Sequence, residues 1–102
     1  MILVTVANGF LGGALISRLV GDRICNGVVA AVRRNSSPLP EGVRKFQIGD
    51  LFSTVDWREG LRGVDAVVHC AARVHVMHDS ATDPWQAYRE VNVDGTLNLA
   101  RQ

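Results

Sequence analysis

Small residues close to the N-terminus have a spacing that can hold an anion. Gly9 and Gly12 follow the apolar run 2–6, which is too short for a helix. Three leucines then repeat at helical spacing, namely Leu11, Leu15 and Leu19. When a strand, a tight turn and a helix follow in this order, the helix aims its unpaired N–H groups and the positive end of its dipole at the turn. We therefore predict an anion site here, and the pyrophosphate of a dinucleotide is its natural occupant.

Position 6 departs from the pattern of a dinucleotide turn, which usually has a third glycine directly after the strand. Val6 stands there instead. If its backbone is left-handed or crowded, a β-branched residue costs on the order of 1–3 kcal/mol, and its side chain reaches toward the pyrophosphate. In the alternative, the turn relaxes and Val6 simply completes the strand. The sequence leaves both alternatives open.

Two arginines follow the second apolar run, 28–32. In dinucleotide-binding folds an Asp or Glu at this place holds the ribose hydroxyls, whereas a nearby Arg accommodates the extra phosphate of NADP. Arg33, together with Arg34, therefore favours NADP over NAD, because guanidinium groups match phosphate oxygens. The alternative is a pair of solvated loop arginines.

Histidines and an aspartate in the segment 73–82 invite a metal interpretation. His75, His78 and Asp79 would share one face only if the segment were helical, and it is polar and irregular. We therefore expect loop residues near the substrate or in solvent, and no metal site. His69 lies at the end of an apolar run and is interpreted as a core histidine with satisfied hydrogen bonds.

The composition is that of a single globular domain without nucleic-acid or membrane partners. The 102 residues are 47% hydrophobic and carry a net charge of +1, with arginines scattered along the chain. No apolar run approaches the roughly 20 residues that span a bilayer, and no basic segment precedes the N-terminal run as in a signal peptide. Cys25 and Cys70 lack metal-ligand spacing and fit reduced thiols, so we expect a cytoplasmic protein.

The apolar runs and the residues between them predict alternating strands and helices. Buried strands are expected at 2–6, 28–32 and 65–70, and a strand nearer an edge at 44–48. Helices are expected from Phe10 or Leu11 to Val20, from Ser53 or Thr54 to about Leu61, and from Pro84, with Asp83 as its N-cap, to Gln102. The three leucines of the first helix would face the sheet, and this helix would connect two parallel strands. The alternation predicts an α/β fold with a doubly wound parallel sheet of Rossmann type, of which residues 1–102 form an incomplete part with about four strands and three helices.

Four segments carry motifs in a recognisable order: Thr5 to Gly12, Gly49 to Leu51, His69 to Ala72, and Val91 to Thr96. Together they resemble extended short-chain dehydrogenases/reductases, the NAD(P)-dependent nucleotide-sugar epimerase/dehydratase family. The first is similar to that family's Thr-Gly-x-x-Gly-x-x-Gly fingerprint, and the second to the segment that contacts adenine. The third resembles the His-x-Ala-Ala segment that lines the cofactor, and the fourth resembles the Asn-Val-x-Gly-Thr stretch of the helix below the active site.

The resemblance implies a cofactor site. Its residues would be Ala7, Asn8, Gly9, Phe10, Leu11, Gly12, Arg33, Arg34, Asp50, Leu51, Ala71 and Ala72. Asp50 would accept a hydrogen bond from the adenine amino group while Leu51 packs on the ring. Alternatively, Asp50 only caps the following turn. The two alanines would leave room for the cofactor, although the end of a core strand also uses alanine.

The resemblance also implies chemistry that these 102 residues do not complete. Family members pair a Tyr with a Lys four residues later for proton transfer. Four residues after Tyr88 comes Asn92, which would only support the helix, and the chain's lysine is Lys45. The catalytic strand and helix would follow Gln102. We expect hydride transfer to a nucleotide sugar in the complete enzyme, an epimerase, a dehydratase or a 4-keto-sugar reductase; the alternative is a non-catalytic or degenerate dinucleotide-binding module.

The last predicted helix has two apolar faces. One comprises Tyr88, Val91, Gly95 and Leu99, and the other comprises Val93, Leu97 and Ala100. One face can cover the sheet. The resemblance implies that the other joins the four-helix interface of a homodimer.

Overall fold

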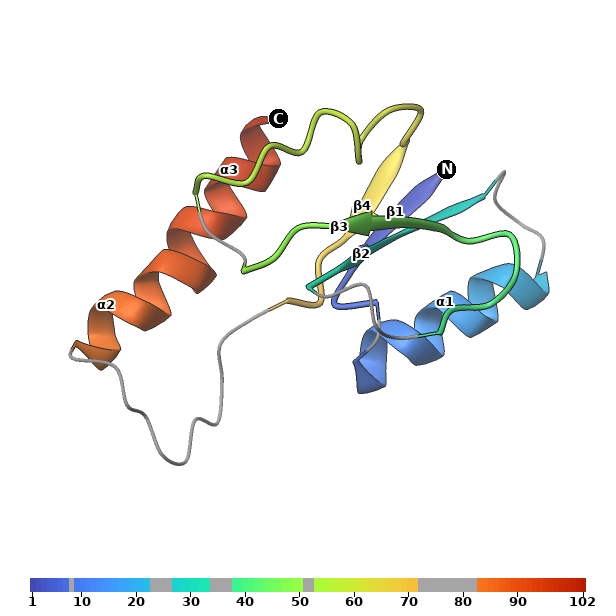
Figure 1. The fold of residues 1–102 in the computed structure, drawn as a ribbon, viewed down its shortest axis with the longest axis horizontal. Helices are drawn as coiled ribbons and strands as arrows, with labels where there is room; N and C mark the ends of the chain where they lie inside the picture. Colours follow the sequence, from blue (N-terminus) through green and yellow to red (C-terminus); the bar gives the residue numbers. More distant parts are fainter. Residues whose placement is uncertain (8, 23–26, 34–37, 51–52, 72–82) are drawn as a thin grey trace.

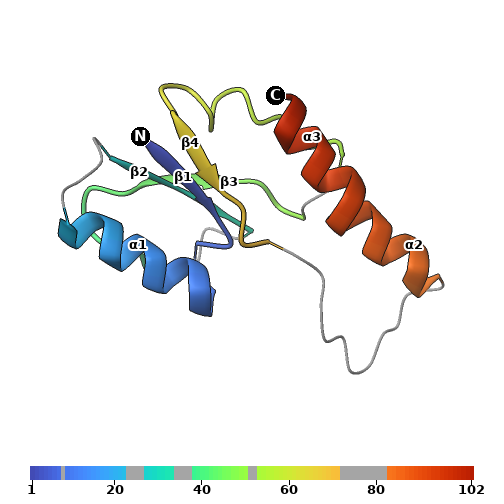
Figure 2. The ribbon, with the colours of Figure 1, turned by 180° about the vertical axis from the view of Figure 1, so that it is seen from behind.

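The structure is a computed structural model that describes residues 1–7, 9–22, 27–33, 38–50, 53–71 and 83–102. Within these ranges four parallel strands form one sheet in the order β3-β2-β1-β4: β1 (Ile2–Thr5), β2 (Val28–Val32), β3 (Arg44–Gln47) and β4 (Ala66–Val68). Helix α1 (Phe10–Asp22) lies on one side of the sheet. A continuous helical stretch of α2 (Pro84–Arg89), η1 (Glu90–Gly95) and α3 (Thr96–Arg101) lies on the other (Figure 1 and, from behind, Figure 2). The predicted α/β fold with a Rossmann-type parallel sheet is confirmed.

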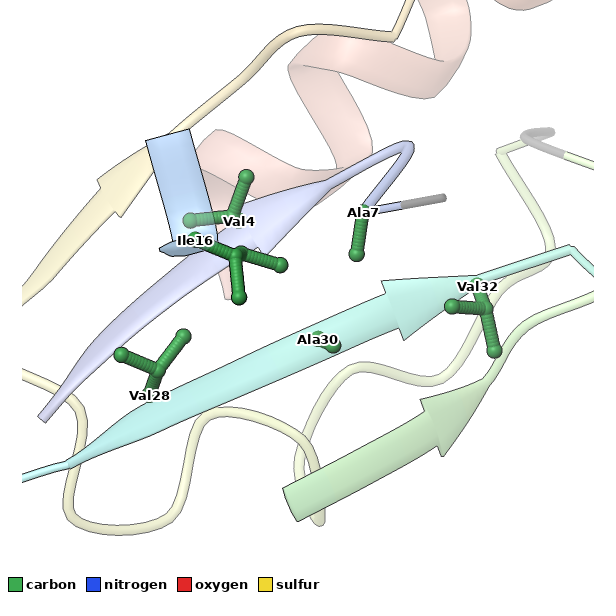
Figure 3. Packing of buried hydrophobic residues seen from close by; sticks show 6 residues of the cluster. All are labelled: Val4, Ala7, Ile16, Val28, Ala30 and Val32. Atoms are coloured by element: carbon green, nitrogen blue, oxygen red, sulfur yellow. The ribbon is translucent and has the colours of Figure 1, made fainter. Parts of the chain in front are cut away.

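Alternate residues of β1 and β2 point to opposite faces of the sheet and build two cores. The core under α1 consists of Val4, Ala7, Ile16, Val28, Ala30 and Val32 (Figure 3). The core on the side of α3 consists of Leu3, Val29, Ala31, Trp57 and Leu99. All five residues of β2 are buried, because this strand has a neighbour on each edge and a core on each face.

Helix α1 forms where the leucine spacing predicts it, but it meets the sheet through different residues. Gly12 and Ile16 are its buried residues, while Leu15 and Leu19 are partly buried beside them. The expectation for Leu11 is wrong, since this residue is 66% exposed. Gly12 faces the backbone at the end of β1, and this orientation turns the preceding residue out toward solvent.

The short helix expected from Ser53 or Thr54 to about Leu61 is wrong. This segment consists of turns around Trp57, whose side chain is fully buried. Two side chains at the end of the last helix bind the backbone of these turns. Asn98 Nδ2 donates to the Val55 carbonyl at 2.8 Å, and the Trp57 N–H donates to Oε1 of the C-cap residue Gln102 at 2.8 Å. Burial of the indole and these distant partners outweigh the local capping signal.

The fourth strand is shorter and more exposed than the sequence predicts. Only Ala66–Val68 pairs with β1, and Val67 and Val68 are 39% and 37% exposed. The strand is the edge of the sheet formed by the described residues, so it is covered by a neighbour on one side only. Apolar composition predicted burial here, whereas position in the sheet decides it.

The last helix begins as predicted and contains a π-helical segment that was not predicted. Asp83 is the N-cap, and its side chain accepts a hydrogen bond from the Gln86 N–H at 3.2 Å. The two apolar faces are also observed, because Leu99 is buried whereas Val93 and Leu97 are 44% and 43% exposed. None of the helices in the described ranges is long and apolar enough to cross a membrane.

Candidate functional site

The turn after β1 is tight and holds Val6 in the left-handed region. The strand ends at Thr5, and Val6 has φ +50°. Its carbonyl oxygen accepts a hydrogen bond from the Gly9 N–H at 2.9 Å, and the Gly9 carbonyl accepts one from the Gly13 N–H at 2.8 Å. Of the two alternatives left open by the sequence, the strained turn is therefore observed, and completion of the strand by Val6 is wrong.

Both glycines of the pattern lie in close contact with Val6, Gly12 with its backbone and Gly9 with its side chain. A Cβ atom on Gly12 would lie 2.2 Å from the Val6 carbonyl oxygen and 3.2 Å from that of Thr5. A Cβ atom on Gly9 would lie 2.7 Å from Cγ1 of Val6. The start of α1 can therefore press against the end of β1, so that its first N–H groups, which lack intrahelical acceptors, are presented at the carboxyl end of the sheet.

We expect Val6→Gly to raise the free energy of unfolding by about 1 kcal/mol and to tighten dinucleotide binding. Glycine adopts positive φ without the cost that a β-branched residue bears, although it loses more chain entropy on folding. It also removes the side chain that lies over Gly9. Urea unfolding and a titration with NADPH measure the two effects.

Val6→Ala is the control, because it trims the side chain and keeps a Cβ in the left-handed conformation. Glycine should be the more stabilising of the two replacements. Equal unfolding free energies for the wild type and both variants would contradict the assignment of strain to Val6.

A buried threonine ties the turn to β4 and the last helix. Oγ1 of Thr5 accepts hydrogen bonds from the N–H groups of Cys70 at 2.8 Å and Ala71 at 3.0 Å, and it lies 3.0 Å from Nδ1 of His69. Nε2 of His69 lies 3.0 Å from Oγ1 of Thr96 in α3. The expected hydrogen bonds of His69 are thus confirmed, whereas its expected place in the core is wrong, because the side chain is only partly buried and lines a hollow beside β4. Its partners were missed, although a threonine at the end of an apolar strand is a signal for such a bond.

The contacts of Thr5 determine the protonation of His69. Two backbone N–H groups occupy the acceptor positions of the hydroxyl, so the hydroxyl donates its proton to Nδ1. His69 is therefore neutral, carries its proton on Nε2 and donates it to Thr96. Burial lowers the pKa of His69 below its usual value, in agreement with the neutral form.

This lowered pKa predicts that the free energy of unfolding falls as the pH drops below about 6.5, the pKa of histidine in an unfolded chain. Below that pH the unfolded state takes up the proton before the folded state does, so the stabilisation present at neutral pH is lost as the pH falls through the folded pKa. Urea unfolding of the wild type and His69→Gln, measured across this range, isolates the effect from that of the other histidines. Parallel pH profiles for the two proteins would contradict the prediction.

At the ends of β2 and β3, the structure brings Arg33 and Asp50 together. Nε of Arg33 lies 2.7 Å from Oδ1 of Asp50, and both side chains are exposed. The Ile48 N–H donates to the Val32 carbonyl at 2.9 Å, which continues the strand pairing up to these residues. Arg33 is thus solvent-exposed and engaged in an ion pair.

The predicted site residues within the described ranges follow the carboxyl ends of the strands, which form one edge of the sheet. Residues 7 and 9–12 follow β1, Arg33 follows β2, Asp50 follows β3, and Ala71 follows β4. Because the four strands are parallel, their carboxyl ends meet at this edge, as the arrowheads in Figure 1 show. The helix residue Asn92 lies in η1. Outside the described residues lie Asn8, Cys25, Arg34, Leu51, Ala72, His75, His78 and Asp79.

A hollow of about 450 Å³ lies elsewhere, along β4 and α3. Its lining includes Val67, Leu99 and Ala100, together with His69 and Thr96. None of the predicted cofactor-binding residues within the described ranges contributes to it. We therefore assign the candidate site by the convergence of the strand ends rather than by the size of this hollow.

The comparisons with known proteins agree with this geometry. The model of the NAD dependent epimerase/dehydratase family matches residues 2–102. A UDP-glucose 4-epimerase from Vibrio cholerae is 40% identical over 104 residues, which cover 99% of this chain and 30% of that protein. A 3-beta-hydroxysteroid dehydrogenase from Mycolicibacterium neoaurum is 32% identical over 103 residues, which cover 96% of this chain and 27% of that protein.

A solved structure has the same fold. MoeE5 in complex with UDP-glucose and NAD is 33% identical to this chain, with a TM-score of 0.75. The match covers 98% of this chain and 31% of that one. The chain thus spans less than a third of the length of the relatives that it matches.

Proposed function

The chain belongs to the NAD-dependent epimerase/dehydratase family, and on this premise we propose that residues 1–102 are the dinucleotide-binding part of an enzyme that transfers hydride between NAD(P) and a nucleotide sugar. This proposal rests on the close packing of α1 against the turn at Gly12, where a Cβ atom would lie 2.2 Å from the Val6 carbonyl oxygen. A backbone packed so closely leaves the start of α1 open to a diphosphate.

The residues at this edge fit a dinucleotide. The turn residues Ala7 to Gly12 would hold the pyrophosphate through backbone N–H groups. Asp50 would accept a hydrogen bond from the adenine amino group, and Leu51 would pack on the ring. Ala71 and Ala72 would leave space beside the cofactor. The nicotinamide would accept or supply the hydride. The side chains that exchange a proton with the substrate would belong to a part of the enzyme outside residues 1–102.

A nucleotide sugar is the proposed substrate class. Support comes from the similarity to a UDP-glucose 4-epimerase and to MoeE5, whose structure contains UDP-glucose and NAD. The reaction would be that of an epimerase, a dehydratase or a 4-keto-sugar reductase. All three reactions would use a Tyr and Lys pair for proton transfer, and residues 1–102 do not contain it, since Asn92 stands four residues after Tyr88.

NADP is the proposed cofactor rather than NAD. Arg33 stands where other dinucleotide folds place an acidic residue for the ribose hydroxyls. A guanidinium group there suits the additional phosphate of NADP. The solved relative binds NAD, so the proposal for NADP depends on this residue.

Two further proposals concern assembly and location. The outward face of the last helix exposes Trp85, Val93 and Leu97, and we propose that it pairs with a second copy in a homodimer. We also propose a cytoplasmic location, because Cys70 forms no disulfide within the described residues and a reduced thiol suits a reducing compartment.

The alternative is a non-catalytic or degenerate dinucleotide-binding module, and the strained Val6 favours its degenerate form, in which cofactor binding is lost, as the second candidate. Titration of the chain with NADPH and NADH, followed by cofactor fluorescence, separates the two candidates. We expect saturable binding that 2′,5′-ADP displaces. A chain that is folded by circular dichroism but binds neither cofactor would support the degenerate module and contradict the first proposal.

A further inference from the structure

The ion pair at the ends of β2 and β3 joins two residues with opposite consequences for a phosphate. Arg33 and Asp50 are 17 positions apart in sequence, yet Nε of one lies 2.7 Å from Oδ1 of the other. Their side chains are 66% and 49% exposed, so a ligand at the carboxyl edge of the sheet can reach both. The continued pairing of these strands, through Ile48 and Val32, holds the two residues side by side.

An anion that binds Arg33 must compete with a carboxylate already in place. A 2′-phosphate offers oxygens that suit the guanidinium group better than a single carboxylate oxygen does. It also carries negative charge, which Asp50 repels at short range. A ribose with a free 2′-hydroxyl has neither interaction, so its binding does not require the pair to open.

We propose that Asp50 sets the preference between NADP and NAD, because it holds Arg33 in an ion pair that NADP must break and NAD leaves intact. The inference rests on the proposed dinucleotide-binding function. It assigns to Asp50 a role in specificity that is separate from any contact with adenine. An exposed pair of this kind is weak, and it therefore shifts the preference without abolishing the binding of either cofactor.

The chain offers a matched control in a second exposed pair. Nη2 of Arg58 lies 2.7 Å from Oδ2 of Asp56, and these side chains are 84% and 57% exposed. Both residues belong to the turns between β3 and β4, away from the strand ends that carry Arg33 and Asp50. Asp56→Asn therefore changes the net charge as Asp50→Asn does, without freeing Arg33.

The experiment measures the dissociation constants of NADP and NAD by titration for the wild type and for four variants: Asp50→Asn, Arg33→Ala, the double variant and Asp56→Asn. We expect Asp50→Asn to improve the affinity for NADP relative to NAD by about two- to fivefold, the range that an exposed ion pair supports. Asn keeps a carbonyl oxygen for the adenine amino group, and any change there affects both cofactors alike. In the Arg33→Ala background the same replacement should shift the ratio by a smaller factor, because only the direct repulsion between Asp50 and the phosphate is then removed. Asp56→Asn should leave the ratio at the wild-type value.

Three results would overturn the inference, and they are distinguishable. An unchanged ratio in Asp50→Asn would show that the pair does not compete with the phosphate. An equal shift in the presence and absence of Arg33 would show that Asp50 acts by direct repulsion alone. Binding of neither cofactor to the folded wild type would overturn the proposed function, and this inference with it.

Discussion

Gly12→Ala should lower the free energy of unfolding by about 3 kcal/mol or more, the upper range for overpacking a close contact. The added Cβ would lie 2.2 Å from the Val6 carbonyl oxygen and 2.9 Å from the Val6 carbonyl carbon. Both atoms belong to the backbone at the end of a buried strand, so neither can move without displacing β1 or α1. Urea unfolding followed by circular dichroism measures the loss, and titration with NADPH should show that cofactor binding is lost with it.

Gly13→Ala is the matched control on the same helix turn. A Cβ on Gly13 would lie 3.5 Å from the Ala7 carbonyl oxygen, which is an ordinary van der Waals contact. Alanine in a helix should therefore stabilise the protein by about 0.5–1 kcal/mol. Similar stabilities of the two variants would contradict the packing of α1 against the turn.

Trp57→Ala should lower the free energy of unfolding by about 3–5 kcal/mol. The indole is fully buried in the core with Leu3, Val29 and Leu99. Its ring centroid lies 6.0 Å from that of Phe46, at an interplanar angle of 47°. Alanine would leave a large cavity between the sheet and α3, because Val55 and Leu61, which pack against this core from the same segment, are much smaller than the indole. Urea unfolding measures the effect.

Trp57→Phe is the control for volume, and we expect it to cost about 1–2 kcal/mol. Phenylalanine is smaller, but it removes Nε1, which is buried and has no hydrogen-bond partner among the described residues. The lost packing is thus partly offset by the removal of an unsatisfied donor. An alanine variant as stable as the phenylalanine variant would show that the ring does not support this core.

Much of the fold follows from local patterns. The apolar runs predicted the strands, with ends that differ by a few residues, and the leucine spacing predicted α1. Asp83 followed by proline predicted the start of the last helix. These signals work because side-chain periodicity and capping depend on residues close together in sequence. The glycine pattern predicted the tight turn for the same reason.

The errors concern segments whose conformation depends on distant partners. The helix expected near Trp57 is replaced by turns, since the indole is buried and Asn98 binds the Val55 carbonyl. Leu11 is exposed because the close approach at Gly12 sets the rotation of α1. The burial of β4 was overestimated because composition does not reveal which strand lies at the edge of the sheet.

For this protein, the sequence by itself determined the four strands, the first and the last helix, the glycine turn and the resemblance to a dinucleotide-binding family, all of which are encoded by residue type and short-range spacing. The tertiary structure decided the left-handed conformation of Val6, the pairing of Arg33 with Asp50, and the bonds that join Thr5 to His69. Thr5 and His69 are 64 positions apart, and a threonine at the end of a strand does not reveal which distant residue it binds. Such contacts arise only when parallel strands place their carboxyl ends together, because hydrogen bonds and ion pairs depend on distance in space.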